Sequence, residues 1–358
     1  MKKRGILFGM ILSCAVMTAW GCGNEKKLSS IEGDQAASSS SEDGGGKDSE
    51  DSKFKDDKSE DDNPFDTEEI EESGQEVLAN YGWGIENFDA KKRELSYDGK
   101  TMEIDFSFDN SSKKFQAGIL IFIDGIAQKY SLEPQGKEDY IIPVDIEKKE
   151  NQIVKVYLEP RFEKDGESHT VHFASMYEPS YRISDDKKGY GAYHSISVQS
   201  PWSLRCKGRT EKDLVGNTVQ YSNLTKEQRD YYIYRNDDGT IKNTLEGMKF
   251  EFAQDGIVLE DNAVDKNKKL ELDVLGGEET AYRISAWLDG KPAKVFGGKE
   301  YDDFVAKSGK RAVFDLDFAS SDVKAEKYSS LEFIVCPIAQ DAFQMEYMIE
   351  NPEALYIE

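Results

Sequence analysis

The sequence predicts an all-β protein with two tandem β-sandwich domains, which follow a signal peptide and a disordered acidic linker. Three observations lead to this fold class. Beyond residue 90, apolar and polar residues alternate with a period of two, the pattern of half-buried strands. Similar strand sequences then recur in the second half of the chain. Before residue 78, in contrast, a short apolar segment is followed by a long polar tract that contains few aliphatic residues.

The N-terminal segment has the three parts of a secretory signal. Lys2, Lys3 and Arg4 form a positive head, and residues 5–19 carry no charge. This apolar stretch is shorter than the ~20 residues that a permanent membrane-spanning helix needs. We therefore expect residues 1–21 to be a signal peptide.

Cys22 stands where the apolar segment ends, in the sequence AWGC. These residues resemble the lipobox of bacterial lipoprotein signals, whose cysteine is acylated and becomes the mature N-terminus. Gly21 fits that pattern, Trp20 is atypical of it, and Cys14 is a rival position. The resemblance implies that Cys22 carries lipid chains, such as palmitate, which anchor the protein on the extracytoplasmic face of the cell membrane. A plain secreted or uncleaved segment is the alternative.

Residues 22–77 are predicted to form a disordered linker. Residues 23–75 include 18 acidic and 6 basic residues together with runs of Ser and Gly. Such a segment buries too little apolar surface to offset the entropy of ordering it. The whole chain has a net charge of −24, so the part beyond the linker is acidic too. This charge argues against nucleic acid as a partner, because binding to phosphate needs basic residues.

Two copies of one β module are predicted after the linker. The clearest match is between residues 118–125 (GILIFIDG) and 283–290 (RISAWLDG), because each strand ends at an Asp-Gly pair typical of tight hairpins. Three further pairs of predicted strands match in the same order: 101–108 with 269–274, 141–146 with 312–318, and 154–160 with 331–337. Short strands between Gly, Pro, Asn and Asp turns indicate sandwiches.

The modules resemble the immunoglobulin-like domains that are common in bacterial surface proteins, although the Cys…Trp…Cys pattern of antibody domains is absent. We expect Trp287 to fill the corresponding core position in the second copy, where the first copy has Phe122. The predicted first sandwich spans residues 78–207 and the second spans 247–358. Residues 208–246 form a connector with one short helix, because Thr225 and Gln228 have the spacing of a capping box. Residues 177–208 either complete the first sandwich or lead to the second.

An aromatic segment at the end of the first module supplies the candidate ligand-binding residues. Tyrosine, tryptophan and arginine commonly carry the binding energy of interfaces, but tyrosine also suits strands and sandwich cores. The candidates are Tyr177, Tyr181, Arg182, Tyr190, Tyr193 and Trp202, with Asp185 as a further polar partner.

The three histidines of the chain lie close together in sequence, at positions 169, 172 and 194. Three imidazoles can hold zinc, but positions i and i+3 of a strand point to opposite faces. We therefore expect His169, His172 and His194 to be partly exposed strand residues, with no metal and no cofactor. Cys206 and Cys336 are the only cysteines left to pair after processing, and one disulfide between them stays open.

These observations favour a non-catalytic, lipid-anchored envelope protein that binds a protein, peptide or glycan at the bacterial surface. No serine-hydrolase, zinc-protease or phosphate-loop motif is present in the sequence. One alternative is a solute-binding lipoprotein of a transporter, which would be a two-lobed α/β protein. The other is an envelope hydrolase, which would need carboxylates or histidines clustered in one cleft.

Overall fold

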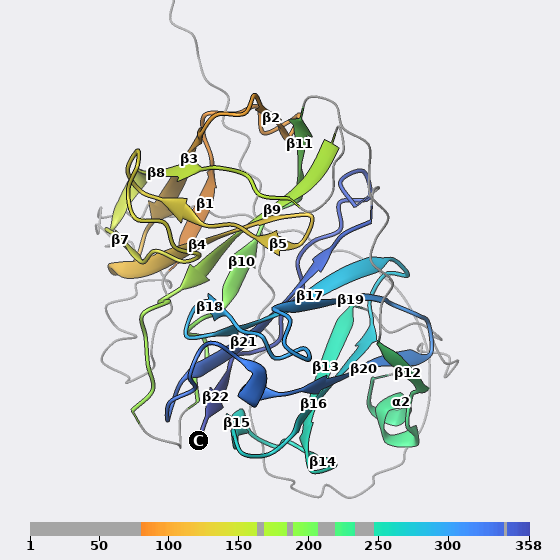
Figure 1. Ribbon diagram of the computed structural model, residues 1–358. Helices are drawn as coiled ribbons and strands as arrows, with labels where there is room; N and C mark the ends of the chain where they lie inside the picture. Colours follow the sequence, from red (N-terminus) through yellow and green to blue (C-terminus); the bar gives the residue numbers. More distant parts are fainter. Residues whose placement is uncertain (1–79, 163–167, 185–188, 207–218, 233–246, 340–341) are drawn as a thin grey trace, which may run out of the picture. The chain divides into compact units, whose positions relative to one another are not determined.

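The computed structural model describes residues 80–162, 168–184, 189–206, 219–232, 247–339 and 342–358 (Figure 1). All of these residues belong to one compact unit. The predicted signal peptide, Cys22 and the predicted linker 22–77 lie outside the described residues, as do large parts of the connector 208–246.

The first half of the described chain folds into two sheets. Sheet I has the strand order β1-β3-β8-β6, and sheet II has the order β2-β11-β9-β4-β5, with β10 on β9 and β7 on β4. All pairings are antiparallel except that of β2 with β11. The bounds are β1 Tyr81–Ile85, β2 Glu94–Tyr97, β3 Met102–Asn110, β4 Phe115–Ile123, β5 Ile126–Ala127, β6 Tyr130–Ser131, β7 Val144–Ile146, β8 Lys149–Leu158, β9 Ser168–Tyr177, β10 Ile196–Val198 and β11 Trp202–Cys206.

The second half forms two more sheets. Sheet III has the order β12-β20-β16-β13-β14, and sheet IV has the order β15-β22-β21-β17-β18, with β19 on β17. Here β15 and β22 are the parallel pair. The bounds are β12 Gln220–Asn223, β13 Met248–Gln254, β14 Ile257–Val258, β15 Ala263–Val264, β16 Leu270–Gly276, β17 Ala281–Leu288, β18 Lys291–Pro292, β19 Tyr301–Val305, β20 Lys310–Leu316, the 3₁₀ turn Phe318–Ser320, β21 Ser330–Pro337 and β22 Leu355–Ile357.

The all-β prediction is confirmed, and both halves are immunoglobulin-like sandwiches. In the first, β1, β3, β8 and β6 take the places of strands A, B, E and D, while β4, β9 and β11 are strands C, F and G. Alternation decides which side of a strand is buried. In β3, Met102, Ile104, Phe106 and Phe108 are buried in the first core, and in β16, Leu270, Leu272 and Val274 are buried in the second.

The repeat is visible in the pairing of the strands. β3 and β16 occupy equivalent places, and so do β4 and β17, which confirms two of the four strand matches made from sequence. The other two matches are wrong. Residues 144–146 form β7 beside β4, whose counterpart is β19 beside β17, and β21 corresponds to β9 rather than to β8. Both wrong matches rest on apolar content and order along the chain, which strands of different sheets share.

The two Asp-Gly turns are built identically. Asp124 and Gly125 have φ angles of 48° and 73°, and Asp289 and Gly290 have φ angles of 50° and 75°, as a two-residue type I′ hairpin requires. Each aspartate also binds the start of the neighbouring strand F. Asp124 Oδ1 accepts from the Thr170 amide at 3.0 Å, and Asp289 Oδ1 accepts from the Ser330 amide at 3.0 Å.

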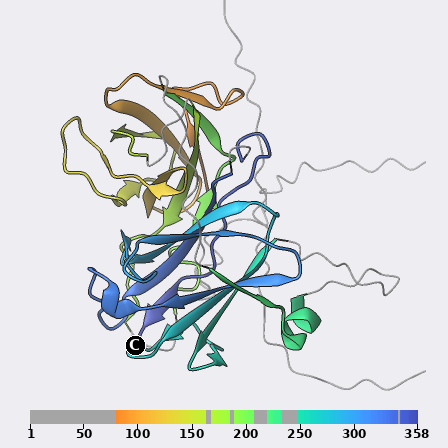
Figure 2. The same ribbon diagram turned by 45° about the vertical axis from the view of Figure 1, so that its right-hand side comes forward.

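The connector contains the expected helix, α2 (Lys226–Tyr232), which Figure 2 shows beside β12. Its capping box is confirmed. The Gln228 amide donates to Thr225 Oγ1 at 3.1 Å, while Gln228 Oε1 accepts from the Thr225 amide at 3.0 Å. Gln228 also donates to Glu251 on β13 and, at 3.2 Å, to Asp273 on β16, so the capping residue holds the helix against sheet III.

The segment after β9 completes the first sandwich, because β10 pairs with β9 and β11 pairs with both β9 and β2. Beside strand E the two sandwiches differ. The first places β6 there, whereas the second uses β12, which precedes the module in the chain. Cys206 and Cys336 are both free thiols, which settles the open question of their pairing.

A matched pair of glycine substitutions tests this arrangement. Alanine at either turn must adopt a positive φ, which costs about 1–2 kcal/mol. A Cβ on Gly290 would lie 3.5 Å from Ile141, whereas a Cβ on Gly125 would lie 2.8 Å from Ile338 and 2.9 Å from Arg283, both in the second sandwich. We expect Gly290→Ala to lower the free energy of unfolding by about 1–2 kcal/mol and Gly125→Ala to lower it by about 1–3 kcal/mol more.

Urea denaturation of the two variants measures the difference. Equal losses of free energy of unfolding would contradict the close contact between the Gly125 turn and the second sandwich.

Candidate functional site

The two sandwiches contact each other through the outer faces of sheets II and IV. This junction has an apolar centre from four strands and the segment after β21, formed by Leu120, Phe122, Ala174, Met176, Trp287, Ile334, Cys336 and Ile349. The rings of Phe122 and Trp287 meet edge to face with 5.9 Å between centroids. These two residues occupy equivalent positions in the repeat, so the modules meet as the subunits of a two-fold dimer would. Trp287 therefore fills the junction and not the core of its own sandwich, contrary to the sequence-based expectation.

At one side of the junction, strand F of the first sandwich holds a segment of the second. His172 on β9 lies opposite Phe122, and its Nε2 is 3.2 Å from the backbone carbonyl oxygen of Tyr347. Arg93, just before β2, pairs with Glu346 and stacks over the ring of Phe343. The segment 342–349, which follows β21, is therefore fixed to the first sandwich.

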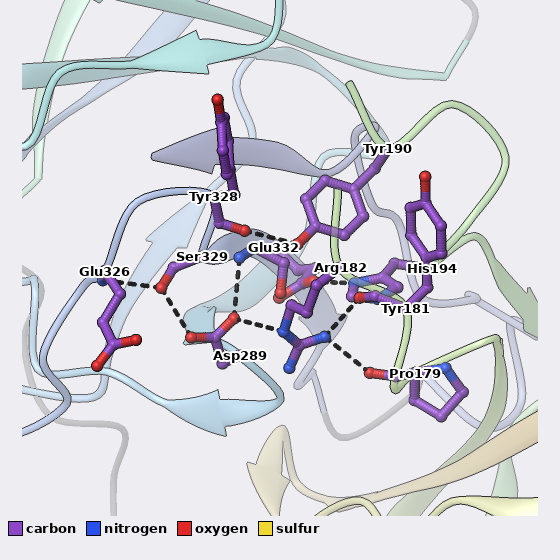
Figure 3. A network of polar contacts seen from close by, with 11 residues as sticks. Pro179, Tyr181, Arg182, Tyr190, His194, Asp289, Glu326, Tyr328, Ser329 and Glu332 are labelled. Atoms are coloured by element: carbon purple, nitrogen blue, oxygen red, sulfur yellow. Dashed lines mark hydrogen bonds and ion pairs between the residues drawn. The ribbon is translucent and has the colours of Figure 1, made fainter. Parts of the chain in front are cut away.

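At the other side, strand F of the second sandwich holds a segment of the first (Figure 3). Glu332 on β21 occupies the position equivalent to His172, opposite Trp287. Its Oε1 is 2.6 Å from Nδ1 of His194, and both side chains are buried. Nε2 of His194 faces the Tyr181 carbonyl oxygen at 3.1 Å. Nε2 therefore donates to the carbonyl oxygen, and one proton lies between Nδ1 and the Glu332 carboxyl group, carried by the ring or by the acid.

Further polar contacts surround this pair. The Arg182 guanidinium lies 3.0 Å from Asp289 Oδ1 and donates to the carbonyl oxygens of Pro179 and Tyr181 (Figure 3). Tyr190 donates its hydroxyl hydrogen to the Tyr328 carbonyl oxygen at 3.0 Å. Burial raises the pKa of Tyr190, against the opposing charge of Arg182, so this phenol stays a donor at neutral pH.

Most of the predicted ligand-binding residues come together here. The rings of Tyr181 and Tyr193 stack with 3.8 Å between centroids, Tyr177 stacks on Tyr193 at 5.9 Å, and Tyr190 meets Tyr181 edge to face. Tyr190 also packs with Tyr328 and Tyr356 of the second sandwich. Trp202 is apart from this group, in the core of the first sandwich beside Phe173. Asp185 lies outside the described residues.

Burial limits what this aromatic group can bind. Tyr177, Tyr190 and Trp202 expose only 5%, 1% and 3% of their surfaces. The segment after β9 folds back onto the second sandwich, and this contact covers the rings that an aromatic platform would present. Only Tyr181, Tyr193 and Arg182 keep part of their surface exposed, and Arg182 is paired with Asp289.

The expectation that the histidines are partly exposed is wrong, because all three are buried. His169 and His172 do point to opposite faces of β9. His169 stacks on Phe162 and binds Asp124 Oδ2 at 2.7 Å, whereas His172 faces the junction. Across the described ranges, no group of three or more His, Cys, Asp or Glu side chains is arranged to hold a metal ion.

Several junction residues were missed by the sequence analysis, above all Glu332 and the roles of Asp289 and Trp287. One signal was present. The runs VHFASMY in β9 and LEFIVC in β21 are nearly continuous in apolar residues, which is typical of strands covered on both faces. Such runs indicate that a second layer packs on the sheet, but they do not say which layer.

Elsewhere, an open hollow lies on the second sandwich, lined by residues 266–269 and 315–319. Its lysines are engaged: Lys268 pairs with Asp255, Lys269 with Asp315, and Lys266 donates to the Ala325 carbonyl oxygen. Among the residues that the structure covers, no helix is long and apolar enough to cross a membrane.

The fold and the junction define a protein of two immunoglobulin-like sandwiches joined face to face. No family model matches the chain, and no curated protein matches it either. Among solved structures it is similar to a chaperone–tip adhesion subunit complex of Csu pili from Acinetobacter baumannii, with 12% identity, 78% of this chain and 98% of that chain covered, and a TM-score of 0.19.

It is also similar to the calcium-binding domain CBD12 of CALX1.1, with 8% identity, coverage of 69% and 79%, and a TM-score of 0.17. A third likeness is to a transglutaminase of red sea bream, with 7% identity, coverage of 84% and 34%, and a TM-score of 0.18. TM-scores this far below 0.5 carry no argument about the function of this chain.

The contacts of the three histidines predict three different ring states. His172 should be neutral with its proton on Nε2, since that nitrogen faces a carbonyl oxygen and burial lowers the pKa of His172 to about 4. His169 should carry a proton on Nδ1, which faces Asp124. His194 should carry a proton on Nε2, which faces the Tyr181 carbonyl oxygen, and share a second proton between Nδ1 and Glu332. Long-range ¹H–¹⁵N correlation spectra at pH 7 distinguish these states, and each His→Gln variant assigns its signal. A His194 ring without a proton on Nε2 would contradict the contact with the Tyr181 carbonyl oxygen.

Proposed function

We propose that the chain is a non-catalytic, lipid-anchored protein of the bacterial cell envelope that binds a protein, peptide or glycan outside the membrane. The N-terminal sequence supports the anchor, since a positive head, an uncharged segment and AWGC precede the acidic tract. The acidic, Ser- and Gly-rich composition of the linker suits an extended tether that holds the sandwiches away from the membrane surface.

The observation that carries the binding role is the junction itself. Its buried His–Glu pair, its tyrosines and its apolar centre all serve to join two modules, so the loops and edges of both are held in one fixed arrangement. Preorganised loops on a rigid scaffold suit recognition, because little ordering entropy is lost on binding. The all-β fold does not match the two-lobed α/β architecture expected of a solute-binding lipoprotein.

Recognition is then assigned to apolar side chains that the fold leaves exposed. Ile257 and Val258, at the turn between β13 and β14, expose 72% and 55% of their surfaces. Met345 and Met348, in the segment after β21, expose 54% and 46%. Methionine is flexible and adapts to a partner's shape, and the base of its segment is held at Tyr347 and Glu346.

The anchor is tested by acylation. We expect the wild-type chain, expressed in a bacterium with lipoprotein processing, to incorporate labelled palmitate and to partition into Triton X-114. Cys22→Ser should lose both properties, because no thiol remains at the predicted site of acylation. Cys14→Ser is the matched control and should keep both. Labelling that survives Cys22→Ser but is lost in Cys14→Ser would place the acylated cysteine at position 14. A wild-type chain that incorporates no palmitate would contradict the lipid anchor.

The binding role is tested by photocrosslinking of the full chain in its native envelope. A photoreactive amino acid replaces Ile257 or Met345 in two separate variants, and Lys100, whose side chain is 83% exposed, serves as the control position. We expect a discrete adduct from Ile257 or Met345 and none from Lys100. Adducts at no position would contradict the binding role, and a transporter subunit as the sole adduct would favour the solute-binding alternative.

A further inference from the structure

His172 lies in an unusual place for a titratable group. It is fully buried between two apolar sheet faces, opposite Phe122 on β4 and against the segment 342–349 of the second sandwich. Nε2 binds the Tyr347 carbonyl oxygen, but Nδ1 has no hydrogen-bond partner among the described residues. A neutral ring fits this site, because a single N–H donor meets a single acceptor.

The equivalent position of the second sandwich is satisfied differently. Glu332 meets the His194 ring, so the charged or shared-proton state of that pair is matched by partners on both sides. The same strand position therefore holds a histidine at one end of the junction and a carboxylic acid at the other. Among the residues that the structure describes, no group at the His172 end accepts a second ring proton.

Most charged groups on the elements around His172 are already engaged. Glu350, directly after the segment 342–349, is the exception: burial raises the pKa of its carboxyl group, so its protonation favours the closed state as the pH falls, opposite in sign to that of His172. Asp124, at the end of β4, binds His169 and the Thr170 amide. Arg93 and Glu346 pair with each other beside the segment 342–349, and Arg283 on β17 forms a bidentate pair with Asp303. None of these groups is within hydrogen-bonding reach of Nδ1.

We propose that the contact between the two sandwiches is acid-sensitive, and that protonation of His172 loosens it by placing a charge and an unmatched N–H donor between two apolar sheets. Loosening would expose the faces that carry Phe122 and Trp287. This device goes beyond the proposed function and holds whether or not Cys22 is acylated. A chain outside the membrane would meet the pH of its surroundings directly, so acid would uncover an apolar surface that neutral pH keeps closed.

The sign of the effect follows from the two states of the ring. Burial lowers the pKa of His172 to about 4 in the closed state, against the opposing effects of the Tyr347 carbonyl and Asp124. In an open, solvated state the pKa returns to about 6.5. Between these values the open state binds a proton that the closed state does not, so the opening equilibrium rises as the pH falls, and it levels off below about 4. From pH 7.5 to pH 5.0 the opening constant should rise about 30-fold.

Hydrogen exchange of the full chain, purified in detergent, measures this opening. Labelling times at pH 7.5 and pH 5.0 are scaled for intrinsic exchange. We expect the junction segments to lose protection by about 30-fold at pH 5.0, read at the amides of Tyr347, which donates to Ala342, and of His194, which donates to Tyr177. Strands β3 and β16, in the two cores, should keep their protection.

Two glutamine variants identify the responsible group. His172→Gln retains a donor for the Tyr347 carbonyl oxygen but does not titrate, so its junction should no longer respond to acid. His169→Gln, on the same strand but facing the core of the first sandwich, should keep the full response. An unchanged response in His172→Gln would overturn the proposal. Two results for the wild-type chain would also overturn it: junction protection that does not change with pH, or junction protection that falls together with that of both cores. These two results do not depend on whether the variants fold.

Discussion

Within the described ranges, four strands are buried on both faces, and the rest of the structure depends on covering the second face of each. In β4, β9, β17 and β21 nearly every residue is buried. One face of each strand packs into the core of its own sandwich, and the other would be left in water by an isolated module. Covering a large apolar side chain contributes about 1.5–3 kcal/mol. Because the two modules are copies of one design, the simplest cover for the exposed face of one is the same face of the other.

The polar groups of the junction follow from this constraint. A buried carboxylate or imidazole needs a partner, and a partner removed leaves a costly unpaired group. Glu332 finds His194, and His172 finds the Tyr347 carbonyl oxygen, each in the segment that follows strand F of the opposite module. Such contacts favour one relative placement of the modules over others, because a shifted placement would leave these buried polar groups without hydrogen-bond partners. Most of the tyrosines predicted to bind a ligand also pack at this junction.

The agreement between sequence and structure was best where the signal was local. Asp124 with Gly125, Asp289 with Gly290, and Thr225 with Gln228 form the turns and the cap that their spacing predicted. It was poorer where a strand had to be given to a sheet. β8 is followed closely by a proline and β21 ends at one, yet β8 is strand E and β21 is strand F. Which strand each one pairs with decides whether it is strand E or strand F. That partner can lie far along the chain, and the strand's own residues do not identify it.

The sequence by itself determined the all-β class, the duplication, the hairpin turns and the capped helix, because each depends on periodicity or on backbone preferences within a few residues. It also supplied the prediction of a lipid anchor at Cys22. Only the tertiary structure decided that Trp287 faces the other module, that Tyr177, Tyr190 and Trp202 are buried, and that Glu332 is part of the candidate site. The physical reason is that burial and polar pairing at the junction are properties of two surfaces together, and neither surface specifies its partner in its own sequence.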